Sequence, residues 1–139
     1  IIIAVGGGGL ISGAISWFQK RKKIVAVEPE NCPTLNVALK KGKPSNVSVS
    51  GIAASALGAK SIGNICFNLS KENQIESLVI SDDEIETARR LLWENHRILV
   101  EPAGAAALAA IISGKYKPKT DEKLAVLICG ANPNIIPEF

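Results

Sequence analysis

The chain has 139 residues, 47% apolar and 21% charged, which is enough for one hydrophobic core and too few for two comfortable domains. This near-average composition excludes disordered, collagen-like and disulfide-scaffold proteins. Because the formal charge is only +3, the chain lacks the concentrated basic face of nucleic-acid-binding proteins, and we expect no nucleic-acid partner.

The cysteines and the apolar runs indicate the compartment. Cys32, Cys66 and Cys129 are odd in number, and no two of them form a Cys-x-x-Cys pair, so neither a disulfide framework nor a zinc site is expected. No apolar run approaches the roughly 18 residues of a membrane helix, and the first strand is too short for a signal peptide. We therefore expect a cytoplasmic protein with no membrane partner.

The first predicted elements form a β-α-β unit. Residues 1–5, Ile-Ile-Ile-Ala-Val, are a continuous apolar run, the pattern of a strand covered on both faces in a parallel sheet. A helix is predicted over residues 10–22, followed by a buried strand over residues 24–27. The helix is expected to pack through its apolar positions, which are Leu10, Ala14, Trp17 and Phe18. Because the chain has no Met and no polar residues before its first strand, we expect it to begin in the middle of a fold.

The middle of the chain is less regular. A short helix is predicted over residues 34–41, ended by Gly42, and a polar connection over residues 43–50 follows it. Residues 52–69 contain small residues that favour a close-packed turn and a helix. A third short strand is predicted over residues 78–80.

Helix signals dominate the next segment. Ser81 and Glu84 fit a capping box at the start of a helix over residues 82–96. A brief extended segment is predicted over residues 98–100. A helix over residues 102–113 starts on a proline and is almost wholly apolar, so it must be buried nearly all round.

Residues 124–129, Leu-Ala-Val-Leu-Ile-Cys, are predicted to form a fourth buried strand. Strands alternate with helices throughout, and no internal repeat is present. The pattern therefore predicts a single α/β domain over residues 1–139, with a mostly parallel sheet between two layers of helices.

Four consecutive glycines, Gly6–Gly9, separate the first strand from the first helix. They are costly in backbone entropy, so a ligand is expected to approach the backbone closely there. Backbone amides at a helix N-terminus bind phosphate and other anions, and open α/β sheets bind ligands outside the carboxyl ends of their strands. The alternative is a turn whose glycines only allow the strand and helix to pack tightly.

The glycine run matches neither of two common nucleotide motifs. Gly-x-Gly-x-x-Gly is not met in any register, and no Gly-Lys-Ser or Gly-Lys-Thr follows, as a P-loop requires. Glu28 ends the second strand about twenty residues on, where a ribose-binding acid would lie, and this keeps a dinucleotide open. A small phosphorylated cofactor held only by backbone amides fits better.

Five segments, in order, resemble those of one enzyme family. The segment from Val5 to Gly13 resembles the phosphate-binding loop of fold-type II pyridoxal phosphate enzymes, the group that includes the tryptophan synthase β-subunit. Four more follow in the order of serine and threonine dehydratases, namely Val27–Pro29, Ser81–Ile85, Leu99–Leu108 and Ile128–Asn132. The resemblance covers nearly the whole chain and implies the C-terminal portion of the large, cofactor-binding domain, without the N-terminal half of the enzyme.

The resemblance implies the cofactor contacts. The amides of Gly6, Gly7, Gly8, Gly9 and Leu10 would hold the phosphate of pyridoxal 5′-phosphate, and Cys129 would face its pyridine nitrogen. A thiol cannot hold that nitrogen as a formal pyridinium in the way a carboxylate would, which moderates the electron sink and suits β-elimination. Without the resemblance, Cys129 is equally explained as a small buried hydrophobe.

The resemblance also implies a cation site, for K⁺ or Mg²⁺, beside the phosphate loop. Its ligands would be the Glu28 carboxylate and main-chain carbonyls that map to Gly6, Cys32, Leu57 and Ala59. Ligation by oxygen alone suits a hard cation. The alternative for Glu28 is a solvated acid at a strand end.

The residue expected to do the proton chemistry is not in this chain. The family's Schiff-base lysine lies in a Ser-x-Lys or Asn-x-Lys context in the N-terminal half of the enzyme, so it is expected upstream of Ile1, and the chain alone is expected to be inactive. Glu101 is expected chiefly to stabilise the start of a helix, and His96 to be structural.

For the complete enzyme, the resemblance implies β-elimination of L-serine or L-threonine to a 2-oxo acid and ammonia. It also implies a small amino-acid substrate and a homodimer. Cys129 and the segment Ala56–Ala59 resemble the serine dehydratase branch most, because serine racemases and threonine deaminases usually have Ser at position 129. The alternatives are a serine racemase or another fold-type II lyase or synthase, and a non-catalytic module that binds a phosphate ligand.

Overall fold

The computed structural model describes residues 1–132 and contains a parallel sheet. Its strands are β1 (Ile2–Ala4), β2 (Val25–Pro29) and β3 (Glu76–Ile80), hydrogen-bonded in the order β1-β2-β3. Ile2 is paired with Val25, and Val25 with Glu76, so the carboxyl ends of all three strands lie at the same edge. Ligands of open parallel sheets bind at this edge.

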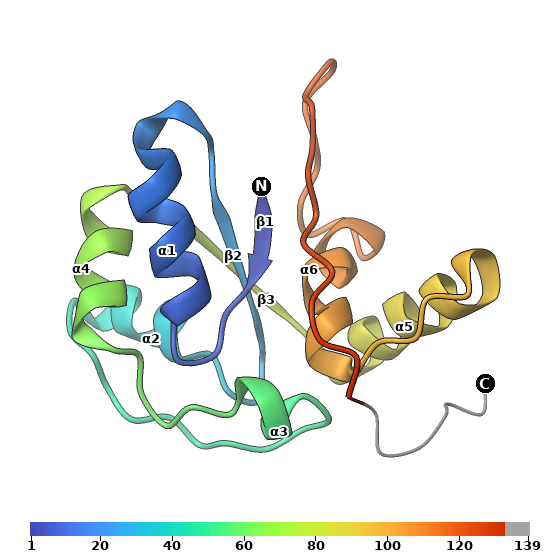
Figure 1. The fold of residues 1–139 in the computed structure, drawn as a ribbon. Coiled ribbons are helices and arrows are strands. Elements are labelled where there is room, and N and C mark those ends of the chain that lie inside the picture. Colours follow the sequence, from blue (N-terminus) through green and yellow to red (C-terminus); the bar gives the residue numbers. More distant parts are fainter. Residues whose placement is uncertain (133–139) are drawn as a thin grey trace.

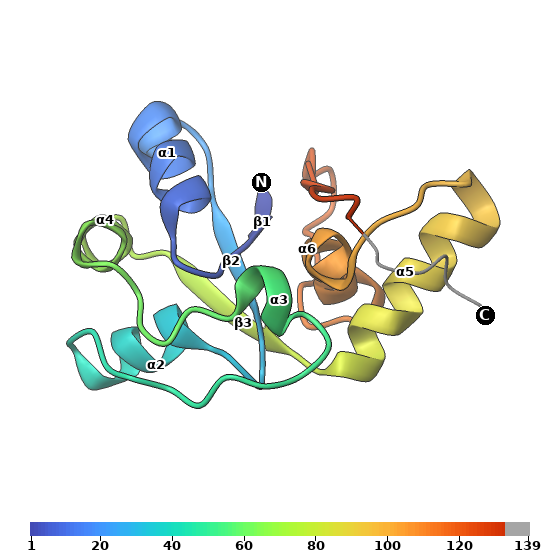
Figure 2. The same cartoon turned by 60° about the horizontal axis from the view of Figure 1, so that its bottom comes forward.

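Helices cover both faces of the sheet (Figure 1). One layer consists of α1 (Gly9–Phe18), α2 (Thr34–Lys41) and α4 (Asn64–Glu72), and the other of α5 (Asp82–His96) and α6 (Pro102–Ile112). The short α3 (Ala54–Leu57) lies at the carboxyl edge of the sheet (Figure 2). The predicted three-layer α/β architecture is confirmed.

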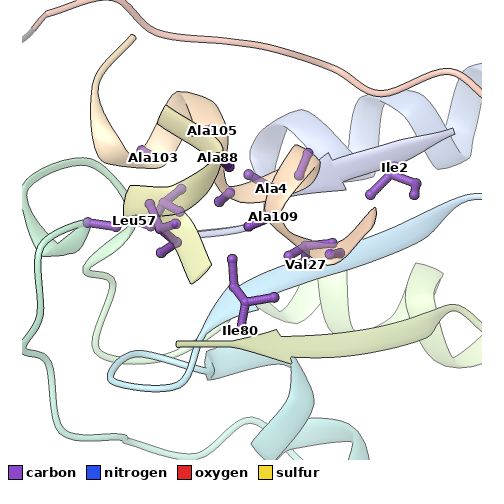
Figure 3. Packing of buried hydrophobic residues seen from close by; sticks show 14 of the residues in the cluster. Ile2, Ala4, Val27, Leu57, Ile80, Ala88, Ala103, Ala105 and Ala109 are labelled. Carbon is purple, nitrogen blue, oxygen red and sulfur yellow. The ribbon is translucent and has the colours of Figure 1, made fainter. Parts of the chain in front are cut away.

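Alternate residues of the strands contribute to two separate cores. Ile2, Ala4 and Val27 pack with α5 and α6, whereas Ile3 and Val5 pack with α1, α2 and α4. Figure 3 shows the first core, in which alanines of α6 lie against β1 and β2. Because most side chains of α6 are alanine, this helix approaches the sheet closely and is buried almost all round, as its composition predicts.

Three helix predictions are confirmed. Helix α2 covers residues 34–41 and ends at Gly42, which is left-handed with φ 73°. Helix α5 starts with the predicted capping box, since Ser81 Oγ accepts from Glu84 N and the Glu84 carboxylate accepts from Ser81 N. Helix α6 has Pro102 as its first residue.

The predicted packing face of the first helix is only half right, since Ala14 and Phe18 pack against the core as predicted. The buried side chains of α1 are Ile11 and Ile15, whereas Leu10 and Trp17 are 53% and 73% exposed. The helix also ends at Phe18, because Gln19 takes a positive φ of 49°, and a 3₁₀ turn, η1 (Gln19–Arg21), follows. Local periodicity therefore specified only part of the face of this helix that meets the core.

Two predicted extended segments are not full strands. Residues 98–100 form no regular element, and residues 124–129 contribute a single parallel bridge, between Val126 and Ile2. That bridge still places the segment next to β1, where Ile2 N donates to Ala125 O at 2.8 Å and Leu127 N donates to Ile2 O at 3.0 Å. No helix within residues 1–132 is long and apolar enough to cross a membrane.

Candidate functional site

A cleft of about 280 Å³ opens at the carboxyl edge of the sheet. It is lined by the glycine loop, the start of α1, the end of α3, the start of α6 and the turn after residue 128. The cleft therefore brings Gly6–Gly9 and Leu10 together with Cys129, although more than a hundred residues of sequence separate them. These are the six residues predicted to hold the cofactor.

The glycine loop presents backbone rather than side chains to the cleft. Gly8 is the N-cap of α1 with φ 92°, and the first amide that bonds back within the helix is Ser12 N, 3.0 Å from Gly8 O. The amides at the start of α1 thus have no acceptor within the helix, and the positive end of its dipole faces the same point. A β-carbon on Gly7 or on Gly9 would meet no atom within 4 Å, which leaves room for an anion.

The other two glycines are required by close packing. A β-carbon on Gly6 would lie 2.9 Å from Leu57 Cα, and one on Gly8 would lie 2.5 Å from Cys66 Sγ. Such distances are too short for any larger residue without a shift of the neighbours. The loop is therefore a packed cradle of amides, and it fits the phosphate of the expected cofactor.

Cys129 reaches the cleft from the segment that borders β1. Its side chain is half-buried, and burial, together with the nearby Glu101 carboxylate, raises the pKa of its thiol. The thiol is therefore protonated at neutral pH. A neutral thiol can share a hydrogen bond with a ring nitrogen.

The helix-start position predicted for Glu101 is confirmed. Glu101 is the N-cap residue of α6, but its side chain makes no capping hydrogen bond. It lines the cleft instead, next to Gly130, whose carbonyl accepts from Glu101 N at 3.3 Å. This position in the cleft is not evident from the sequence, because acids at helix starts are common and usually exposed.

Glu28, the carboxylate expected to bind a cation, is wholly buried. Its two oxygens accept hydrogen bonds from the amides of Leu35 and Asn36, each at 2.7 Å, and from the Ser77 hydroxyl at 3.1 Å. Burial raises the pKa of this carboxyl, and the hydrogen bonds oppose that rise. The alternative of a solvated acid at the strand end is therefore wrong.

Thr34 is a further residue at this position that the sequence did not suggest. Its Oγ1 lies 3.0 Å from Gly6 O and 3.2 Å from Glu28 Oε1. A hydroxyl has one proton, so it can donate to only one of these two acceptors at a time. Three oxygens, those of Thr34 Oγ1, Gly6 O and Glu28 Oε1, thus gather where a cation ligand set was predicted.

The remaining predicted ligands lie just before α2 (Cys32) and at or just after the end of α3 (Leu57 and Ala59). Cys32 O accepts from Thr34 N at 3.0 Å, and Leu57 O accepts from Ala59 N at 2.9 Å. The Leu57 main chain also packs directly against Gly6. No group of three His, Cys, Asp or Glu side chains in residues 1–132 could hold a metal ion, so a cation here would depend on main-chain and hydroxyl oxygens around the single carboxylate.

Neither His96 nor any lysine of residues 1–132 lines the cleft. His96 is exposed and is the last residue of α5. The cleft therefore offers anion-binding amides, a neutral thiol and a carboxylate. No lysine amine of residues 1–132 lies among the residues that line it.

Known proteins resemble this chain in sequence and in fold. The family model described as pyridoxal-phosphate dependent enzyme matches residues 1–130. An L-threonine ammonia-lyase of Thermotoga maritima is 32% identical over 97% of this chain, and a serine dehydratase-like protein of Mus musculus is 34% identical over 95%. A serine racemase of Dictyostelium discoideum is 32% identical over 97% of the chain.

Solved structures of a threonine deaminase and a serine racemase also resemble this chain in fold. A threonine deaminase of T.th. superimposes with a TM-score of 0.84 at 29% identity, covering 97% of this chain and 49% of that one. The serine racemase of Dictyostelium discoideum superimposes with a TM-score of 0.82 at 34% identity, over 96% of this chain and 44% of the other. The chain spans 34%, 44% and 43% of the lengths of the three relatives named above. Because the family model covers almost all of its residues and the fold agrees, the chain belongs to the fold-type II pyridoxal-phosphate dependent enzymes.

Proposed function

We propose that the complete protein is an ammonia-lyase that converts L-serine or L-threonine to a 2-oxo acid and ammonia. The names of the relatives support this, since two of those reported are a threonine ammonia-lyase and a serine dehydratase-like protein. The racemase among them is the competing activity. Cys129 favours elimination, because a neutral thiol leaves the ring nitrogen without a full positive charge.

The observation on which the proposal depends most is the composition of the cleft. The amides of the glycine loop and the first turn of α1 would bind the cofactor phosphate, and Cys129 would meet the ring nitrogen. Pyridoxal phosphate supplies the electron sink that stabilises negative charge on the substrate α-carbon. Ala56, Leu57 and Ala103 provide apolar walls that reduce water around the ring.

The base that takes the α-proton is assigned to the Schiff-base lysine expected outside this chain. No lysine of residues 1–132 reaches the cleft, so none of the described amines can accept that proton directly. The residues of this chain that line the cleft are proposed to bind and orient the cofactor. The chain alone is therefore proposed to be inactive.

A K⁺ or Mg²⁺ ion is proposed to join the glycine loop to its neighbours. Glu28, Thr34 Oγ1 and the carbonyls of Gly6, Cys32, Leu57 and Ala59 would provide oxygen ligands, and oxygen is the ligand that these cations prefer. The ion would neutralise the buried carboxylate and fix the main chain of Gly6 beneath the phosphate.

We also propose that the complete enzyme is a homodimer, which light scattering of the purified protein would test.

The proposed reaction is tested with the complete protein and added pyridoxal phosphate. We expect a visible absorbance band from lysine-bound cofactor, and release of equal amounts of 2-oxo acid and ammonia from L-serine or L-threonine. Racemised serine without 2-oxo acid would assign the protein to the racemases instead. Absence of the absorbance band after reconstitution would favour a non-catalytic phosphate-binding module.

A further inference from the structure

Glu101 has an acidic side chain that helix α6 does not use. It occupies the N-cap position with φ −71° and ψ 162°, yet no side-chain hydrogen bond caps the helix. Shorter residues such as Ser and Asp are the ones that reach the free amides from this position. The glutamate therefore requires an explanation other than capping, and its position in the cleft provides one.

The main chain fixes this carboxylate beside the turn that contains Cys129. Gly130 is left-handed with φ 77°, and a β-carbon there would collide with Glu101 Oε1 and lie 3.2 Å from its Cγ. On the other side of the turn, a β-carbon on Gly104 would collide with Cys129 O. Glycine at both positions lets the start of α6 and the residues 129–130 turn approach each other, with the carboxylate lying over Gly130.

Few other charges act on the Cys129 thiol. Of the described residues that line the cleft, Glu101 and Cys129 are the two with titratable side chains; the loop, α1 and α3 contribute only glycine and apolar residues. On helix α5, which packs against α6, Arg89 donates to Val100 O and pairs with Glu86. Burial and then Glu101 are the two causes that raise the pKa of the thiol.

We propose that Glu101 is a positioning residue that acts on Cys129, so that the sulfur keeps its proton where it meets the ring nitrogen of the cofactor. The contact with the ring rests on the proposed function, but the effect on the thiol does not. The shared proton can lie on sulfur or on the ring nitrogen, and a carboxylate beside the sulfur disfavours the thiolate that the second arrangement requires. No bond is made or broken, and no net proton is gained.

The inference is tested by the rate at which iodoacetamide alkylates Cys129 in the complete protein after removal of the cofactor. Only the thiolate reacts, so the rate near neutral pH reports the thiolate fraction. Cys32 and Cys66 are fully buried, and mass spectrometry of peptides distinguishes the three sites. The variant is Glu101→Gln, and the control is Glu94→Gln, which removes the same charge from an exposed position on α5.

We expect Cys129 in Glu101→Gln to react about three to ten times faster than in the wild type at neutral pH, with its pH profile displaced to lower pH. Glu94→Gln should match the wild type. With pyridoxal phosphate bound, the pH dependence of the visible absorbance should also change in Glu101→Gln alone. A rate in Glu101→Gln equal to or below that of the wild type would overturn the inference.

A folding defect is handled by a second variant. Glu101→Ser removes the charge and supplies a hydroxyl that can cap α6, so it should fold and show the same faster alkylation. Unfolding of both variants would show a purely structural role and overturn the inference. Since alkylation needs no turnover, a faster rate in a protein without lyase activity would contradict the proposed function only.

Discussion

A β-carbon on Gly8 would lie 2.5 Å from the Sγ of Cys66, so the glycine loop rests directly on the first turn of α4. Cys66 is buried at that position, and its Sγ lies 3.8 Å from the Ser70 hydroxyl one helical turn later. One side of the loop thus packs against a helix that contributes no residue to the lining of the cofactor cleft. This contact explains why one glycine of the four is required for packing as well as for its backbone conformation.

Gly8→Ala should therefore destabilise the protein and abolish cofactor binding. Left-handed backbone costs a residue with a β-carbon about 1–2 kcal/mol, and overpacking against Cys66 adds about 1–3 kcal/mol. Urea unfolding and the visible absorbance of added pyridoxal phosphate measure the two effects. The control is Gly13→Ala in the exposed part of α1, where a β-carbon meets nothing within 4 Å. This change should raise the free energy of unfolding by a few tenths to about 1 kcal/mol. Equal stability of the two variants would contradict the packing argument.

Pyridoxal phosphate should protect Cys129 from alkylation. The thiol is half-buried in the cleft that would hold the ring, whereas Cys32 and Cys66 are inaccessible with or without ligand. Cys129→Ala should weaken cofactor binding about 2- to 10-fold, the value of one lost hydrogen bond. Alkylation followed by peptide mass spectrometry tests the first expectation and absorbance titration the second. Unchanged labelling of Cys129 in the holoenzyme would place the ring elsewhere.

Thr34→Val should weaken the response of the complete protein to K⁺ or Mg²⁺. The hydroxyl lies within hydrogen-bonding distance of Gly6 O and Glu28 Oε1, and its removal takes one oxygen from the proposed ligand set while preserving side-chain shape. We expect the cation concentration for half-maximal thermal stabilisation to rise about fivefold or more, on the order of 1 kcal/mol of binding energy.

The control for this change is Thr87→Val, whose hydroxyl bonds to Asp83 O on the exposed face of α5. Melting curves are recorded with choline chloride replacing KCl at constant ionic strength. The same cation response in both threonine variants would contradict the proposed ligand set.

The capping box of α5 should make stability depend on acid pH. Burial would raise the pKa of Glu84, but hydrogen bonds from Lys115 and from the Ser81 amide outweigh it, and the net shift lowers the pKa below 4.5. A depressed folded-state pKa gives stability that is present above the unfolded pKa and is lost as pH falls through the folded value.

Glu84→Gln should accordingly cost about 1 kcal/mol at neutral pH, and the difference from the wild type should shrink as the pH falls below 4.5. Urea unfolding of both proteins between neutral and acid pH measures this difference in the free energy of unfolding. Asp83→Asn, an exposed change in the same helical turn, should cost less than about 0.5 kcal/mol at neutral pH. A cost for Glu84→Gln that stays constant with pH would contradict the assignment of the effect to ionised Glu84.

The sequence by itself determined the features that depend on neighbouring residues. Gly42 ended α2 and Ser81 with Glu84 started α5 where local capping chemistry places these boundaries. The glycine run indicated an anion site because amides at a helix start are a local property. The order of strands and helices likewise specified the α/β class, since a parallel sheet needs a crossover between successive strands.

Only the tertiary structure decided which distant groups meet. It turned α1 so that Ile11 rather than Leu10 is buried, and it brought Thr34 to the oxygens of Gly6 and Glu28. It also placed the Glu101 side chain in the cleft with Cys129, where it makes no capping hydrogen bond to its own helix. These outcomes follow from long-range packing and from the cost of burying polar groups without partners, and neither is encoded in a window of adjacent residues.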